Sequence, residues 1–271
     1  MEAYTVTFGD RAENEAGMQM IGKAAKHGVS VTSLHQIAHS LHDKDIACKI
    51  VSLAPLLQDH IETVPEAAVL VMPGGVNALL GDPTAQATLL AELQSMPKDT
   101  TTKSYGKVRN KHARHNNTMG DFHQEPDIAN GKGTVVQLSE YPTTDKLRHI
   151  VSEMIDALLV GELNHYFDST TCGIGFHGDL ERKLVVGVRV GPGADGMPLR
   201  FQWYKDGSPV GREGRFELNA GDIYIMSEKA VGFDWKKKKI LTLRHAAGKD
   251  SCKYSRIKRK AGEEYPESLT L

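Results

Sequence analysis

The sequence lacks the features that mark membrane proteins, secreted proteins and polycations. No apolar run approaches the roughly 20 residues that a membrane-spanning helix needs. The first ten residues, MEAYTVTFGD, lack the basic and apolar segments of a secretory signal. Lys and Arg number 33 against 34 Asp and Glu, and this net charge of −1 excludes a chain that coats nucleic acid through its overall charge.

Cysteine is also scarce. The chain has three cysteines, Cys48, Cys172 and Cys252, which are odd in number and far apart in the sequence. This spacing argues against a disulfide framework and indicates a reducing compartment. We therefore expect a soluble, monomeric, intracellular protein of the nucleus or cytoplasm, with no membrane partner.

The pattern of apolar and polar residues changes along the sequence. Residues 1–100 alternate strand-like and helix-like runs, residues 101–133 are polar with almost no apolar periodicity, and short strand-like runs separated by turns follow Leu163. The last pattern is typical of a double-sheet jelly roll. We expect an α+β fold, mainly β: a double-stranded β-helix (jelly roll) with flanking helices and an N-terminal α/β extension.

Two helices and one strand are predicted with clear limits. Residues 84–96 have helical character, and residues 145–159 place Leu147, Val151, Leu158 and other apolar side chains on one buried face. Thr143 or Thr144 can cap the second helix. The apolar residues 67–72 predict a buried strand that ends in a tight Pro-Gly-Gly turn.

A histidine and an aspartate stand close together in His177-Gly178-Asp179. In a strand, residues two apart point to the same face, so one strand would present an imidazole and a carboxylate side by side. Two histidines and one carboxylate on one face form the open iron site of non-haem Fe(II) oxygenases. The H-G-D triplet therefore predicts two ligands of such a site, with a third histidine required downstream.

The surroundings of this triplet resemble the AlkB family of Fe(II)- and 2-oxoglutarate-dependent dioxygenases, and most closely its eukaryotic DNA-repair members. The resemblance rests on Asn164-His165-Tyr166 followed by the run IGFHGDLER at 174–182, with further matches in the same order from residue 104 to residue 247. It implies that Fe(II), 2-oxoglutarate and dioxygen together oxidise N-alkyl groups on nucleic-acid bases, releasing formaldehyde from a methylated base. It also implies that Tyr166 and Asn164 bind 2-oxoglutarate.

The third metal ligand departs from the family pattern. The family places its distal histidine shortly after an aspartate-tryptophan pair, but here Asp234-Trp235 is followed by four lysines. Either the ligand is lost, or His245, the only histidine after Asp179, takes the role, and we favour His245. The cation that binds 2-oxoglutarate depends on this choice: Arg256 suits the spacing if His245 is a ligand, whereas a literal alignment selects Arg244.

The resemblance also assigns substrate contacts and domains. Glu181 matches the position of an acid that faces the damaged base, and Lys111 and Arg114 belong to the segment that matches the nucleotide-recognition lid, in which Met119 replaces the usual aromatic residue. The implied division is an N-terminal extension of unknown role at 1–100, a dioxygenase domain at 101–262 with its lid at 101–133, and a tail at 263–271.

Two other functions remain open on the sequence. The net charge of −1 and Met119 are compatible with a 2-oxoglutarate-dependent hydroxylase of a protein or small molecule. The departure at the distal histidine is compatible with a catalytically inactive relative that binds nucleic acid. A base in a duplex would in either nucleic-acid case have to be flipped out or presented in a single strand.

Overall fold

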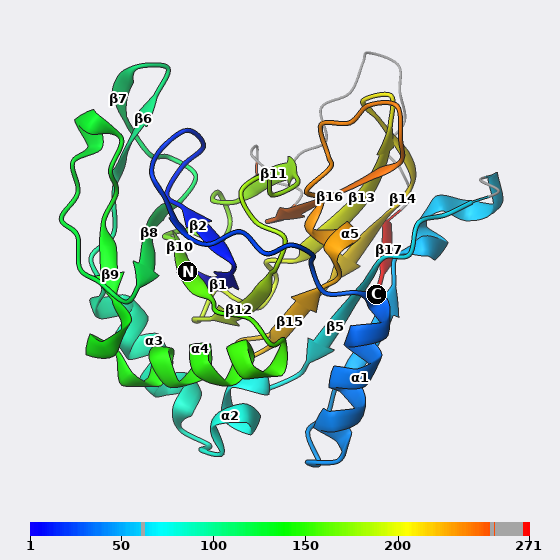
Figure 1. Ribbon diagram of the computed structural model, residues 1–271, viewed down its shortest axis with the longest axis horizontal. Helices are drawn as coiled ribbons and strands as arrows, with labels where there is room; N and C mark the ends of the chain where they lie inside the picture. Colours follow the sequence, from blue (N-terminus) through cyan, green and yellow to red (C-terminus); the bar gives the residue numbers. More distant parts are fainter. Residues whose placement is uncertain (61–62, 250–251, 253–267) are drawn as a thin grey trace.

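Two sheets pack face to face, and each is assembled from distant parts of the sequence (Figure 1). The structure is a computed structural model that describes residues 1–60, 63–249, 252 and 268–271. The larger sheet has the strand order β4-β5-β15-β12-β1-β10-β8-β9, and the smaller has the order β11-β16-β13-β14-β17. The fold is therefore mixed α+β and mainly β.

The strands have the following bounds. Those of the larger sheet are β1 (Ala3–Gly9), β4 (Lys49–Ser52), β5 (Ala68–Met72), β8 (His115–Gly120), β9 (Val135–Gln137), β10 (Val160–Tyr166), β12 (Val186–Val190) and β15 (Ile223–Met226). Those of the smaller sheet are β11 (Ile174–His177), β13 (Leu199–Lys205), β14 (Ser208–Phe216), β16 (Thr242–Ala247) and β17 (Ser268–Thr270). Two further pairs are β2 (Arg11–Glu13) with β3 (Met20–Gly22), and β6 (Thr101–Ser104) with β7 (Lys107–Asn110).

Helices cover one face of the larger sheet. They are α1 (Val31–His42), α2 (Gly75–Leu80), α3 (Ala85–Ser95) and α4 (Pro142–Met154), and Figure 1 shows α3 and α4 lying beneath the strands. A short helix, α5 (Glu228–Val231), follows β15, and 3₁₀ helices lie at Ala54–His60, Ile128–Asn130 and Leu138–Glu140. No helix in the described part of the chain is both long and apolar enough to cross a membrane.

Alternation along the strands gives the larger sheet two different faces. Val6 and Phe8 of β1 and Val188 of β12 pack with Leu147 of α4 in the core between this sheet and the helices. The intervening residues point to the smaller sheet, where Trp203 of β13 lies in a second core. Because side chains alternate along a strand, the face of this sheet that is turned away from the helices also lines a cavity between the sheets.

The N-terminal strand stands in the middle of the larger sheet. β1 pairs antiparallel with β10 on one side and with β12 on the other, so that Thr5 lies opposite both Asn164 and Arg189. The boundary expected at residue 100 therefore does not separate two sheets. The N-terminal segment contributes a central strand between two strands that come more than 150 residues later.

The predicted helix at 84–96 is present as α3, whereas the one predicted at 145–159 is displaced. α4 begins at Pro142, and its first backbone N–H groups are capped by the Glu92 carboxylate of α3, which accepts from the Thr143 and Thr144 amides at 2.8 Å each. This cap from another helix replaces the expected cap by a threonine side chain. Because α4 ends at Met154, the placement of Leu158 on its buried face was wrong: Leu158 is 95% exposed.

The polar segment 101–133 is not a plain loop. Residues Tyr105 and Gly106, with φ of 49° and 73°, form the turn of the β6–β7 hairpin, a conformation that suits a two-residue hairpin loop. β8 follows and pairs with β10, which buries Met119 completely in the helix-covered core. The polar composition did not indicate these strands, because they are held by backbone pairing and side-chain hydrogen bonds and not by burial of apolar side chains.

Candidate metal centre

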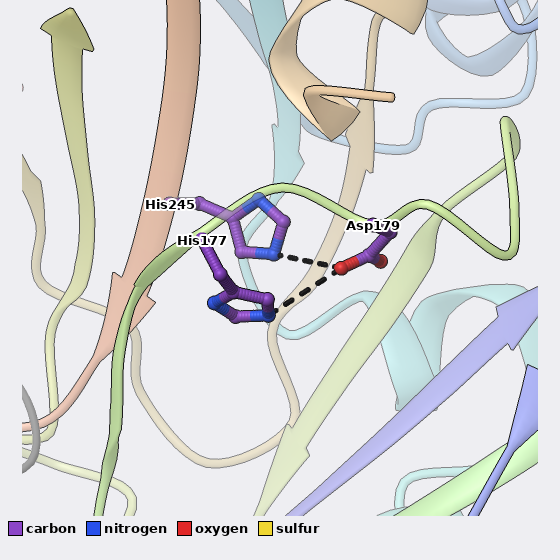
Figure 2. A group of neighbouring side chains, drawn as sticks. All are labelled: His177, Asp179 and His245. Carbon is purple, nitrogen blue, oxygen red and sulfur yellow. Dashed lines mark ion pairs between the residues drawn. The ribbon is translucent and has the colours of Figure 1, made fainter. Parts of the chain in front are cut away.

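Three side chains predicted as metal ligands come together between the sheets. His177, Asp179 and His245 each offer one ligand atom, and these atoms lie within 4.8 Å of one another (Figure 2). The Nε2 atoms of His177 and His245 are each 3.4 Å from the same Oδ1 atom of Asp179. Of the residues that the structure describes, this is the group of His, Cys, Asp and Glu side chains with metal-site geometry.

The distances between these atoms fit a shared metal ion. Nitrogen and oxygen ligands bind divalent transition metals at about 2.0–2.2 Å, so two ligands of one ion at 90–110° stand roughly 3.0–3.4 Å apart. The two separations of 3.4 Å fall at the upper end of this range. Two imidazoles and one carboxylate are the donor set of the facial triad, which leaves coordination positions open on its other side.

Strand pairing brings the two histidines together. β11 and β16 are antiparallel neighbours in which His177 lies opposite His245. The aspartate departs from the prediction, because β11 ends at His177 and Asp179 lies in the loop beyond it, not on the same strand face. Gly178 permits the close approach of this loop to Gly232: a Cβ atom there would lie 2.1 Å from the Gly232 carbonyl oxygen.

The orientation of His177 follows from its second ring nitrogen. Nδ1 lies 2.7 Å from the Gly175 carbonyl oxygen, to which it donates when it carries the proton. That hydrogen bond leaves Nε2 free to face Asp179 and a metal, as is usual for metal-binding histidines. Burial lowers the pKa of His177, but Asp179 outweighs this and raises it overall; burial and the neighbouring His177 lower the pKa of His245.

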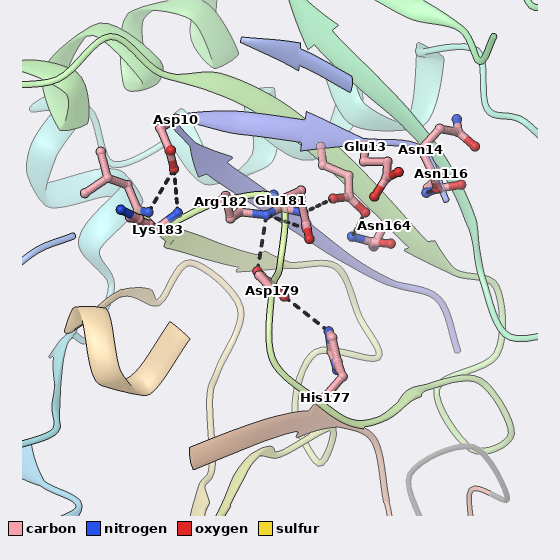
Figure 3. Close-up of polar contacts among 12 residues, drawn as sticks. Asp10, Glu13, Asn14, Asn116, Asn164, His177, Asp179, Glu181, Arg182 and Lys183 are labelled. Atoms are coloured by element: carbon pink, nitrogen blue, oxygen red, sulfur yellow. Dashed lines mark hydrogen bonds and ion pairs between the residues drawn. The ribbon is translucent and has the colours of Figure 1, made fainter. Parts of the chain in front are cut away.

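Arg182 holds the aspartate in place. Its Nε lies 3.2 Å from Asp179 Oδ2, while its Nη2 contacts Glu162 and lies 2.8 Å from Glu181 Oε1 (Figure 3). Burial acts to raise the pKa of Asp179, but the charge of Arg182, with that of His245, brings it well below its usual range. Arg182 thus keeps the carboxylate ionised and leaves Oδ1 turned toward the histidines.

The N-terminal segment supports the same loop. Asp10, just after β1, accepts hydrogen bonds from the backbone amides of Lys183 and Leu184 at 2.8 and 2.9 Å, and from Ala25 at 2.8 Å (Figure 3). Because the loop from Gly178 to Leu184 carries Asp179 and Arg182, Asp10 helps to position the candidate ligand Asp179 from a distance of about 170 residues in sequence.

A cavity of about 620 Å³ opens beside the three ligands. Asn164 and Tyr166, expected to bind 2-oxoglutarate, both line it from β10. Asn164 is buried and its amide oxygen accepts a hydrogen bond from Arg114 Nε. The structure therefore brings Asn164, Tyr166 and Arg114 to the same space as the three candidate metal ligands.

Of the two cations expected to bind 2-oxoglutarate, Arg244 is placed elsewhere. Arg244 precedes His245 in β16 and so points to the other face of the strand, where its guanidinium lies 3.7 Å from the ring centroid of Tyr204. It does not line the cavity. Arg256 lies outside the described residues.

Two of the expected substrate contacts are engaged within the protein. Glu181 lines the cavity but is paired with Arg182. The ammonium group of Lys111 donates to the side-chain oxygens of Asn14, at 2.6 Å, and Asn116, and burial lowers its pKa to about 8. Lys111 thus belongs to an internal hydrogen-bond network, whereas Arg114 faces the cavity.

Sequence reasoning missed Thr5, Arg182 and Arg189 as parts of this site. All three line the cavity. Arg189 had a visible signal, because it is the one charged residue in the otherwise apolar run LVVGVRV at 184–190. Thr5 had none, because its place beside β10 and β12 depends on strand pairing across more than 150 residues.

Comparison with known proteins gives a family but no activity. No protein-family model matches the chain. A protein of Acanthamoeba polyphaga mimivirus, named "Uncharacterized protein R156", is 41% identical over 251 residues, which are 92% of this chain and 96% of the viral protein. At this identity and coverage, the chain belongs to the same protein family as this mimivirus protein.

Proposed function

We propose that this protein is an Fe(II)- and 2-oxoglutarate-dependent dioxygenase. The observation that carries the proposal is the convergence of His177, Asp179 and His245 beside a cavity large enough for a small-molecule cosubstrate. Their donor set and spacing suit a metal that must keep positions open for other ligands.

A jelly roll is the finer fold that we propose. Its two sheets would be β11-β16-β13-β14 and β10-β1-β12-β15, with β5, β4, β8 and β9 as additions to the second sheet. Antiparallel pairing throughout these eight strands supports the proposal. In this arrangement the N-terminal strand completes the second sheet, which gives residues 1–100 a structural role.

In such a site, different residues of the chain would have different roles. An iron(II) ion bound there supplies the activation of dioxygen, coupled to decarboxylation of 2-oxoglutarate to succinate and oxidation of a substrate C–H bond. His177, Asp179 and His245 hold the metal on one face. Arg182 keeps Asp179 ionised and oriented, Asn164 and Tyr166 orient the cosubstrate, and the surrounding sheets limit the access of water.

The substrate that we propose is an N-alkylated nucleic-acid base. Glu13, Glu162 and Glu181 line the cavity beside the metal ligands. Burial raises the pKa of Glu181 and of Glu13, and a cationic group nearby would favour their ionised forms. A base that carries a positive charge through methylation has this chemistry, and the exposed lysines at 236–239 can contact phosphates beside the opening.

A second candidate is a hydroxylase of a protein or small molecule. It is favoured by the placement of Lys111, whose ammonium group is bound by Asn14 and Asn116 and is not presented to a phosphate backbone. The carboxylates that line the cavity would accept an amine or guanidinium group of such a substrate equally well.

Succinate production separates these candidates. Purified protein with Fe(II) and 2-oxoglutarate is assayed with and without single-stranded DNA containing methylated bases, and formaldehyde is measured in parallel. Succinate and formaldehyde that both rise with methylated DNA support the demethylase. Succinate that is unaffected by DNA supports the second candidate, and no succinate under any condition refutes the dioxygenase.

A further inference from the structure

Arg189 is a buried arginine in the cavity wall that has no acidic partner among the described residues. It is 1% exposed, and its Nη1 donates a hydrogen bond to the Met197 carbonyl at 2.8 Å. Within the described part of the chain, its buried Nε has no hydrogen-bond partner and no carboxylate forms an ion pair with it. Because an uncompensated buried charge is strongly unfavourable, this position favours an anionic ligand.

A second unsatisfied polar group stands next to it. Thr5 of β1 is the cross-strand neighbour of Arg189, and its buried Oγ1 has no hydrogen-bond partner in the ranges that the structure describes. Asn164 lies on the other side of Thr5 in the same register. Neighbouring strands are about 4.8 Å apart, so Asn164, Thr5 and Arg189 form a row of hydrogen-bonding side chains along the cavity wall.

Two phenols complete the surroundings of this row. Tyr166 and Tyr224 also line the cavity, and Tyr224 fits there because Gly187, its cross-strand partner, has no side chain: a Cβ atom would lie 1.9 Å from Tyr224 Cζ. Burial raises the pKa of both phenols, to about 12 for Tyr224, while the charge of Arg189 opposes the rise. Both hydroxyls are therefore protonated at neutral pH and can donate to an anion.

The spacing from the metal ligands suits a five-carbon diacid. His245 and Ala247 point to the same face of β16, about 6.7 Å apart along the strand. Ala247 packs with Tyr166 and Met197, and the Met197 carbonyl accepts the hydrogen bond from Arg189. A five-carbon chain with C–C bonds of about 1.5 Å spans about 5 Å, a length comparable with this separation.

We propose that Arg189 and Thr5 bind the distal carboxylate of 2-oxoglutarate, in place of Arg244 and Arg256. The inference rests on the proposed function and assigns its cosubstrate specificity to the inner wall formed by β1 and β12. A guanidinium and a hydroxyl are strong donors to a carboxylate, and a cavity wall with both rejects a 2-oxo acid that lacks the second carboxylate.

Binding measurements with Mn(II) in place of iron test this assignment without turnover. Calorimetry compares 2-oxoglutarate with 2-oxopentanoate, which has the same chain length but no distal carboxylate. We expect Arg189→Met to weaken 2-oxoglutarate binding about 100-fold and Thr5→Val about tenfold, with little change for 2-oxopentanoate. Arg244→Met is the matched control and should retain the affinity of the wild type for both acids.

The outcomes separate this inference from the proposed function. If the wild type binds 2-oxoglutarate and Arg189→Met binds it equally well, the inference is wrong and the dioxygenase stands. If the wild type with Mn(II) binds neither acid, both are wrong. Arg189→Lys, which keeps the charge, and a urea unfolding curve for each variant show that a lost affinity is not lost folding; partial recovery of 2-oxoglutarate binding by the lysine supports the assignment.

Discussion

Replacing His245 by alanine tests whether the third metal ligand is the one that the structure brings to the site. His245 and His177 both lie 3.4 Å from Asp179 Oδ1, on strands that pair directly. If both bind the metal, His245→Ala and His177→Ala should weaken it by similar amounts. The fold should survive either change, because Asp179 keeps its ion pair with Arg182.

The size of the loss can be estimated from the number of ligands. Structural zinc sites with four ligands bind with an apparent 10–16 kcal/mol, or about 2.5–4 kcal/mol for each ligand. Removing one of three protein ligands should therefore weaken metal binding by roughly 100-fold to 1000-fold. Succinate production with Fe(II) should fall below detection in both variants.

The assay is a calorimetric titration of the metal-free protein with Co(II), followed by succinate measurement with Fe(II). His39→Ala is the control, because the His39 side chain in α1 is 82% exposed and lies on the surface. The Co(II) affinity of this variant should match that of the wild type. A His245→Ala protein that binds Co(II) within threefold of the wild type, while His177→Ala does not, would show that His245 is not a ligand.

Three further changes probe the fold and the site. Phe8→Ala, in the completely buried core face of β1, should lower the free energy of unfolding by about 3–5 kcal/mol in urea, whereas Phe122→Ala, 46% exposed, should change it by less than about 0.5 kcal/mol; equal losses would contradict the central place of β1. Gly178→Ala should impair Co(II) binding, because its Cβ would lie 2.1 Å from the Gly232 carbonyl oxygen; unchanged binding and stability would contradict that contact. Burial lowers the pKa of Lys111 to about 8, below an unfolded value of about 10.4, so its buried charge destabilises the fold below pH 8 and this effect disappears as the pH rises to about 10.4. The stability of the wild type relative to Lys111→Met should therefore increase between pH 8 and pH 10, and a constant difference would show that Lys111 has an ordinary pKa.

The sequence by itself determined the features that depend on neighbouring residues. The apolar run at 67–72 and the helical pattern at 84–96 predicted β5 and α3 closely, because burial of one strand or one helix face leaves a local period. The triplet at 177–179 identified two of the three converging side chains because they are close in sequence, although Asp179 lies in the loop after β11 and not on the strand face that was expected. His245 was selected by elimination, and its role as a ligand stays a prediction, although the structure places it beside Asp179.

Only the tertiary structure decided which strands are neighbours and which side chains face the cavity. A strand alternates between its two faces, but its sequence does not say which face meets the metal site. Arg244 and His245 are adjacent in sequence, yet one stacks on Tyr204 outside and the other faces Asp179. Thr5 reaches Arg189 only because β1 enters the sheet between β10 and β12, and that pairing results from burial of apolar side chains over the whole sheet, not from any local signal.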